Sequence, residues 1–117
     1  HDALPILSIN GRDFNLIFGL AFLREINKLH SAELEGMKTG YGAMTLISAG
    51  VAINDPLAFV DIIKAGTITA PQKPSDADIE AYLADLIDKG KYKETIDSII
   101  DELKASSLLK LAMNVQE

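Results

Sequence analysis

The chain has 117 residues, the length of a single domain that can bury a hydrophobic core without covalent staples. It contains no cysteine, which excludes disulfides, thiolate nucleophiles and cysteine-based metal sites. Its net charge of −6 is repelled by phosphate backbones and anionic lipid, and its basic residues form no stripe, so neither a nucleic acid nor a membrane is an expected partner.

The first predicted element is a β-hairpin at residues 4–18. Its two β-prone runs flank Asn10-Gly11, which suits a type I′ turn because both central residues of that turn need positive φ. Apolar and polar residues alternate along each run, as is typical of a half-buried hairpin. A lone two-stranded hairpin is marginal in water, so this one must pack on helices or extend across subunits. The apolar face expected to contact another subunit is made by Leu7, Ile9, Phe14 and Leu16.

Two helices are predicted after the hairpin. The first begins after Gly19 and ends near His30-Ser31, because apolar residues recur there at helical spacing. A short apolar helix follows at about residues 43–49. The apolar run around it, residues 41–53, falls short of the ~20 residues that a membrane span requires.

A strong helix start is predicted at Asp55-Pro56. Asp55 can cap free N–H groups, and Pro56 suits the first helical turn because its missing N–H costs nothing there. The helix that follows is apolar nearly all round, which places it in the core, and Gly66 is its expected C-terminal stop. Residues 67–74 contain two prolines and predict a loop.

The C-terminal third predicts two amphipathic helices and a short final one. Ser75 and Asp78 form a start similar to a capping box, and Gly90 separates the two apolar stripes. The final helix begins at Ser106-Ser107. The sequence therefore predicts one α+β domain over residues 1–117, mainly α-helical, with an N-terminal β-hairpin packed on about five helices.

The hairpin and the helices together offer more apolar faces than a core of this size needs. One or two of them are therefore expected to face other subunits or a partner. For the partner we expect the C-terminal helices, through Tyr92, Ile96, Ile99, Leu103, Leu108 and Leu109. The alternative is that the stripe from Tyr92 to Leu103 packs only against the preceding stripe, Ile79–Ile87.

No catalytic, cofactor-binding or metal-binding site is predicted. His30 has Ser31 beside it, but adjacency in sequence is not triad geometry, and an interaction of His30 with the C-terminal end of a helix explains it better. Carboxylates three or four residues apart, such as Asp85 and Asp88, share a helix face, yet that face is the expected solvent side. A small enzyme using His30 and a carboxylate is the least favoured alternative.

Five blocks of the chain, in order, resemble the tail assembly chaperones of long-tailed (siphovirus-type) bacteriophages or prophages of Gram-positive bacteria. The blocks are Ile9–Asn27, Gly40-Tyr41-Gly42 with the apolar helix after it, Asp55–Gly66, Pro74–Leu83 and Glu102–Lys110. They cover nearly the whole chain, and their order and spacing carry the resemblance. Ile26 and Asn27 depart mildly from the Leu and Asp that are common in the family.

The resemblance implies a non-enzymatic assembly factor without a cofactor. Such proteins bind the tape measure protein, a long helical and partly apolar chain, and keep it soluble while tail tube subunits polymerise around it. They act in the cytoplasm of the bacterial host and are absent from the mature virion. The resemblance also implies a homo-oligomer and a longer form made by a programmed ribosomal frameshift. The nearest alternative is another phage structural or head–tail joining protein.

Overall fold

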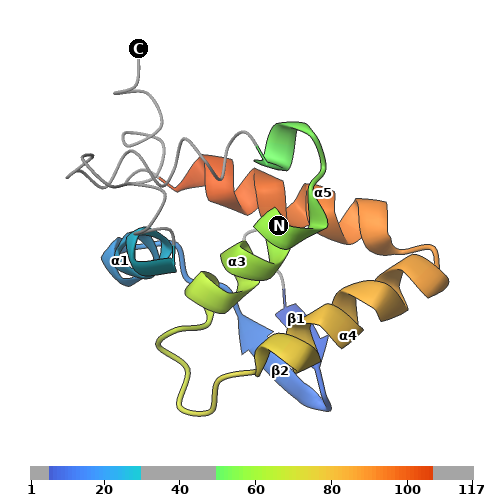
Figure 1. The fold of residues 1–117 in the computed structure, drawn as a ribbon, viewed down its shortest axis with the longest axis horizontal. Helices are drawn as coiled ribbons and strands as arrows, with labels where there is room; N and C mark the ends of the chain where they lie inside the picture. Colours follow the sequence, from blue (N-terminus) through green and yellow to red (C-terminus); the bar gives the residue numbers. More distant parts are fainter. Residues whose placement is uncertain (1–5, 30–49, 107–117) are drawn as a thin grey trace.

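The computed structural model describes residues 6–29 and 50–106, which form a two-stranded antiparallel hairpin followed by helices (Figure 1). The elements are β1 (Ile6–Ile9), β2 (Arg12–Asn15), α1 (Leu20–Leu29), α3 (Pro56–Gly66), α4 (Asp76–Asp88) and α5 (Tyr92–Ala105). A short helical turn at residues 50–52 precedes α3. The predicted α+β class, mainly helical with an N-terminal hairpin, is confirmed.

Several predicted features lie outside the described residues. They are the apolar helix at 43–49, the final helix after Ser106, and the candidate residue His30. Among the helices that the structure does describe, none has both the length and the apolarity needed to cross a membrane.

The hairpin turn has the predicted geometry. Asn10 and Gly11 have φ of 52° and 78°, and the pairing of Ile9 with Arg12 leaves these two as the whole loop. The second strand ends at Asn15, before the predicted hairpin end at residue 18, because the chain leaves the ladder there. Beyond it the Ile17 N–H donates to the Gly66 carbonyl at 3.0 Å, so the linker to α1 is bonded to the end of α3.

Helix α3 begins and ends at the predicted residues, but its C-terminal cap differs from the expected one. The Asp55 carboxylate accepts a hydrogen bond from the Leu57 N–H at 3.0 Å, with Pro56 in the first turn. Gly66, however, is the last residue of the helix and has no left-handed backbone conformation. The C-cap is Thr67, whose buried hydroxyl donates to the Ile63 carbonyl at 2.9 Å. The helix therefore ends at Gly66 as predicted, but Thr67 caps it and no left-handed glycine is involved.

Helices α4 and α5 follow the predicted boundaries. In the capping box, Ser75 accepts from the Asp78 N–H at 3.0 Å, and the Asp78 side chain accepts from the Ser75 N–H at 3.3 Å. Gly90 turns the chain between the helices with φ of 70°. The Lys91 N–H then donates to the Leu86 carbonyl at 2.9 Å, which satisfies a carbonyl at the end of α4.

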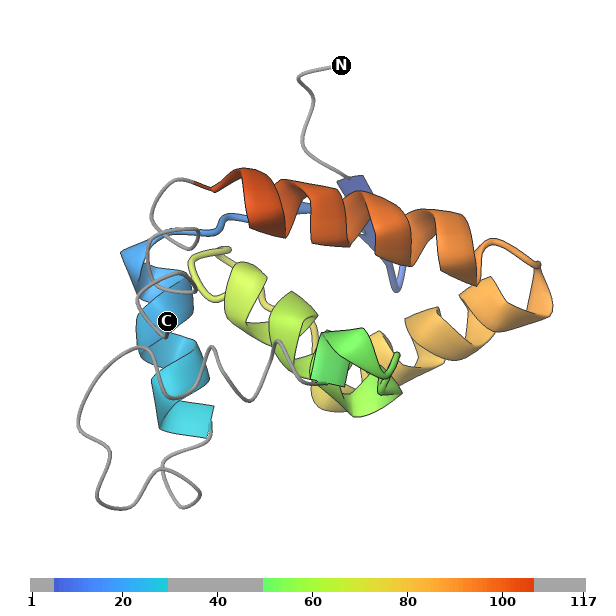
Figure 2. The ribbon, with the colours of Figure 1, turned by 90° about the horizontal axis from the view of Figure 1, so that it is seen from above.

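The buried apolar residues of the described chain, apart from Ala58, form one cluster that takes side chains from both strands and from α1, α3, α4 and α5. Helix α3 contacts α1 and α4, and α4 contacts both α5 and β1. In Figure 2, α5 runs back from the end of α4 across the molecule toward α1. The hairpin is thus packed on helices within one protomer, which is the first of the two arrangements that its marginal stability allowed.

Candidate partner-binding site

The four hairpin residues expected to contact another subunit lie inside the protomer. The exposed fractions of Leu7, Ile9, Phe14 and Leu16 are 1%, 0%, 6% and 0%. Alternation along a strand identifies the face that is buried, but it does not say whether the protomer or a second subunit covers that face. Here the protomer's own helices cover it, so self-association through these four side chains is not available in this conformation.

Three of the six expected partner-binding residues are also part of the core. Ile96, Ile99 and Leu103 are 3%, 0% and 4% exposed, and they belong to the same cluster as the apolar stripe of α4. The alternative, in which α5 packs against the preceding stripe, describes these three residues. Tyr92 is half-buried, with its ring packed edge-on against Phe59. Leu108 and Leu109 lie outside the described residues.

Other large apolar side chains are exposed instead. Within residues 6–29 and 50–106, they are Ile6, Ile17, Leu20, Ile53, Leu57 and Ile87, each between 53% and 75% exposed. Ile87 was expected on the apolar stripe of the helix that begins at Ser75. The nearly continuous apolarity of α3 was the available signal for Leu57, because a helix with one partner face cannot bury its whole circumference. The described residues therefore do expose large apolar side chains, and these six were not among the residues expected to bind a partner.

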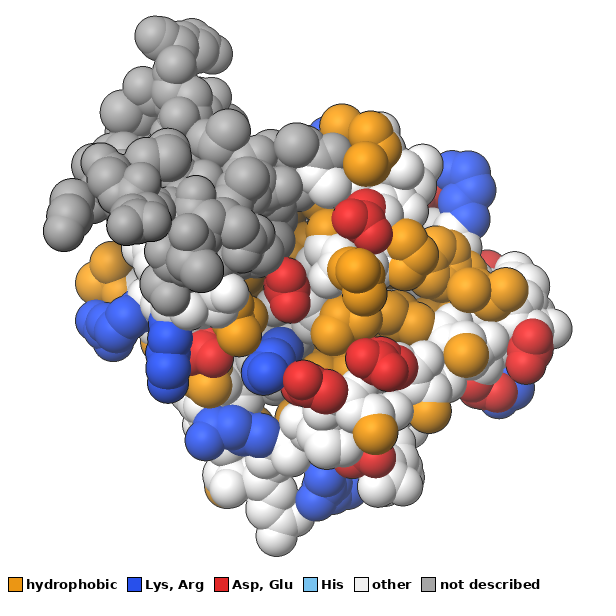
Figure 3. All heavy atoms as spheres, in the orientation of Figure 1, with side chains coloured by type: hydrophobic (Ala, Val, Ile, Leu, Met, Phe, Trp, Pro, Cys, Tyr) orange, Lys and Arg blue, Asp and Glu red, His pale blue; other side chains and the backbone are white. Residues whose placement is uncertain are grey.

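A hollow lies between the turn before α3 and the N-terminal half of α5. Figure 3 shows hydrophobic side chains gathered over the N-terminal ends of these two helices. The hollow has a volume of about 260 Å³. We call it the α3–α5 groove; its lining residues are Asn54, Tyr92, Lys93, Ile96 and Asp97.

The polar side chains of the α3–α5 groove differ in whether they have a hydrogen-bond or ion-pair partner. Lys93 and Asp97 pair with each other at 2.9 Å across one turn of α5. The Tyr92 hydroxyl is buried and has no hydrogen-bond partner among the described residues. Burial raises the pKa of Tyr92, and the negative charge of Asp55 raises it further. This phenol therefore stays protonated at neutral pH.

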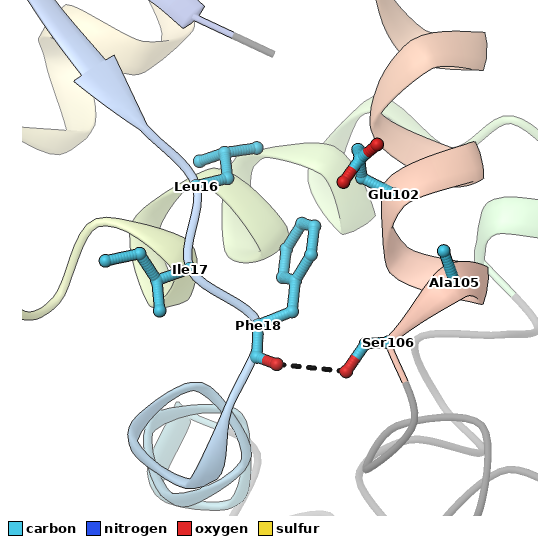
Figure 4. A pocket seen from close by; sticks show the side chains of 6 residues that line it. All are labelled: Leu16, Ile17, Phe18, Glu102, Ala105 and Ser106. Carbon is cyan, nitrogen blue, oxygen red and sulfur yellow. Dashed lines mark hydrogen bonds between the residues drawn. The ribbon is translucent and has the colours of Figure 1, made fainter. Parts of the chain in front are cut away.

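A second hollow, of about 240 Å³, lies between the linker after β2 and the end of α5 (Figure 4). The Ser106 hydroxyl, at the C-cap of α5, donates to the Phe18 carbonyl at 3.0 Å. This bond joins two segments that are 88 residues apart in the chain. A third hollow of about 210 Å³ lies between the hairpin and α4, where Ser8, Asn10 and Asp85 are among its lining residues.

The carboxylates of α4 and α5 are arranged as a solvated surface. Asp85 pairs with Lys89 at 2.9 Å, as Asp97 does with Lys93, each one helical turn away. Within the part of the chain that the structure describes, no three His, Cys, Asp or Glu side chains come together in a way that could hold a metal ion.

Comparison with known proteins identifies the family. The sequence model of the family described as "Phage tail assembly chaperone protein, TAC" matches residues 6–116, from the first described strand nearly to the end of the chain. No curated protein and no solved structure gives a significant match. The matched range includes the hairpin, all the described helices and the α3–α5 groove, so the chain belongs to the phage tail assembly chaperone family.

Proposed function

We propose that this tail assembly chaperone binds the tape measure protein of its own phage and keeps it soluble while the tail tube is assembled. The family match over residues 6–116 carries the proposal, because it assigns a chaperone role in tail assembly. The phage is proposed to be long-tailed and to infect a Gram-positive host, on the strength of the five sequence blocks. The chaperone acts in the host cytoplasm and is absent from the finished virion.

The surface of the described residues supports a chaperone of this kind. A protein that holds a long, partly apolar helical chain needs exposed apolar side chains and no strict side-chain code. Among the described residues, six large apolar side chains are exposed, on β1, the linker after β2, α1, the turn before α3, α3 and α4. The net charge of −6 keeps such a surface, and a complex formed on it, in solution.

Co-expression with the tape measure protein of the same genome tests the proposal. We expect the tape measure protein to be insoluble alone, soluble with this chain, and recovered with it on affinity purification. If the tape measure protein stays insoluble and does not co-purify, the proposed function fails. Recovery of this chain as a component of finished virions would instead favour a structural or head–tail joining protein.

We also propose that the chain self-associates, and that a longer frameshifted form joins the same assemblies. Because the inward face of the hairpin is covered, the contact between copies is made by exposed residues such as Ile6, which is 63% exposed at the start of β1. Sedimentation velocity over a range of micromolar concentrations should show a weight-average sedimentation coefficient that rises with concentration. A coefficient that stays at the monomer value throughout this range would contradict the proposal.

A further inference from the structure

The loop of the β-hairpin contains the one asparagine–glycine pair of the chain, Asn10-Gly11. The chain has five asparagines, and the residues that follow the other four are Leu16, Lys28, Asp55 and Val115. Glycine has no side chain to hinder an attack by its own nitrogen on the amide of the preceding asparagine. Asn10 is therefore the asparagine at which the sequence most favours spontaneous deamidation.

Both residues of this pair are accessible and free of hydrogen bonds. Asn10 and Gly11 are exposed, and a Cβ built on Gly11 would meet nothing within 4 Å, so no neighbouring segment shields the Gly11 nitrogen. Within the described part of the chain, neither the Asn10 side chain nor the Gly11 N–H makes a hydrogen bond. The conformation of the turn therefore controls whether the amide and the nitrogen can meet.

The turn keeps these two groups apart. The φ values of 52° and 78° at Asn10 and Gly11 are those of a type I′ turn, in which ψ of the first central residue is about 30°. At this ψ the Gly11 nitrogen lies on the opposite side of the Cα–C bond from the Asn10 Cβ, so it points away from the side-chain amide. Rotation about this bond at positive φ leads to a conformation that only glycine adopts readily. The turn must therefore open before the nitrogen can reach the amide.

We propose that Asn10 is a deamidation site that the folded hairpin protects and that reacts when the hairpin opens. In the open chain the Gly11 nitrogen attacks Cγ of Asn10, the bond from Cγ to the side-chain nitrogen breaks, and that nitrogen leaves as ammonia with the proton from Gly11. A succinimide ring then joins the two residues. Water opens the ring at either carbonyl, which gives aspartate or isoaspartate. The reaction uses only water, and it is independent of the proposed binding of the tape measure protein.

The isoaspartate product disrupts the hairpin. Its main chain runs through Cβ and Cγ of residue 10, which adds one atom to the loop between Ile9 and Arg12. Turn type and loop length fix the register of a hairpin, so the pairing of these two residues is lost. The same register places Leu7 and Phe14 in the core. A chain whose hairpin has opened and reacted is therefore altered irreversibly and loses part of its packing.

Incubation of the purified chain at mildly alkaline pH, folded and in urea, tests this proposal. Peptide mapping by mass spectrometry locates the lost amide, and an isoaspartyl methyltransferase labels the isoaspartate. We expect modification at Asn10, slower by at least about tenfold in the folded chain than in urea, because the locally open form of a packed element is a minor population. Asn15, which precedes Leu16, is the internal control and should keep its amide under both conditions.

Two variants separate the steps of the proposal. Leu7→Ala weakens the packing of the hairpin and should raise the rate in native buffer toward the rate in urea. Asn10→Asp introduces the charge of the product without the extra main-chain atom, and Asp-Gly also suits a type I′ turn. Its thermal unfolding midpoint should stay within about 2 °C of wild type, whereas the isoaspartate form, separated by ion exchange, should unfold at least about 5 °C lower.

Four results would overturn the inference. They are equal rates in native buffer and in urea, no reaction at Asn10 in urea, earlier loss of the amide of another asparagine, and an isoaspartate form as stable as Asn10→Asp. The first would show that the turn gives no protection, and the last that the extra atom is tolerated. None of them involves the tape measure protein, so the proposed function stands or fails separately.

Discussion

At Gly66, the room available to a side chain matters more than backbone conformation. A Cβ built at this position would lie 2.9 Å from Leu16 Cδ2 and 3.4 Å from Leu16 Cβ, and Leu16 is fully buried. Gly11 and Gly90 differ, because each has a positive φ that L-residues seldom adopt and open space around it. Glycine at position 66 therefore permits the close approach of α3 to the linker after β2, which the bond from the Ile17 N–H to its carbonyl also fixes.

Gly66→Ala should destabilise the fold by about 1–2 kcal/mol, because overpacking against a buried leucine outweighs the better helix propensity of alanine. Urea unfolding followed by circular dichroism measures the difference. Gly19→Ala is the matched control, since a Cβ there meets nothing within 4 Å and the φ is not left-handed. An alanine at 66 that matches or exceeds wild-type stability would show that Leu16 moves aside freely.

At the scale of elements, α4 and α5 show two different ways of fixing where a helix begins. Helix α4 has a complete capping box from Ser75 and Asp78, with Asp76 and Asp78 as acidic residues in its first turn. Helix α5 has no side-chain cap at Lys91, so its start depends on the turn at Gly90 and on the burial of its apolar stripe. Helices α4 and α5 are therefore stabilised at their N-termini by different means.

Ser75→Ala should cost about 1 kcal/mol of stability, the usual effect of removing an N-cap side chain. The same substitution at Ser98, which is exposed in the interior of α5, should be neutral or slightly stabilising, because alanine is the better helix former. Chemical denaturation of both variants beside the wild type makes the comparison. Equal stabilities for the two variants would mean that tertiary packing alone places the start of α4.

At the scale of the whole molecule, a single hydrophobic cluster makes the described elements interdependent. Tyr82 of α4 and Tyr92 of α5 both pack against this cluster, and burial raises the pKa of each. Because the folded-state pKa lies above the unfolded value of about 10, the folded state retains protons that the unfolded state loses. The corresponding stability is complete below pH 10 and is lost as the pH rises through the folded-state pKa.

The midpoint of urea unfolding should therefore be insensitive to Tyr82 ionisation up to about pH 10 and should fall above it. Tyr82→Phe removes this ionisable group, so its midpoint should fall less steeply between pH 10 and 12 than that of the wild type. Lysine deprotonation contributes to both proteins alike and cancels in the comparison. Parallel curves would mean that Tyr82 ionises as freely in the folded state as in the unfolded chain.

The sequence by itself determined the local features of this protein. Asn10-Gly11, Asp55-Pro56, Ser75 with Asp78, and Gly90 each specify a turn or cap through the chemistry of a few adjacent residues, and each was predicted where the structure has it. The family also followed from the sequence, because ordered blocks along a chain are a property of the sequence alone.

Only the tertiary structure decided which apolar faces are covered and by what. Periodicity identified Leu7, Ile9, Ile99 and Leu103 as residues that must be buried, but burial within a protomer and burial against a partner produce the same pattern. The α3–α5 groove brings together residues from the turn before α3 and from α5, and Gly66 approaches Leu16 across 50 residues of chain. Contacts of this kind depend on how the elements pack in three dimensions, which local residue patterns do not encode.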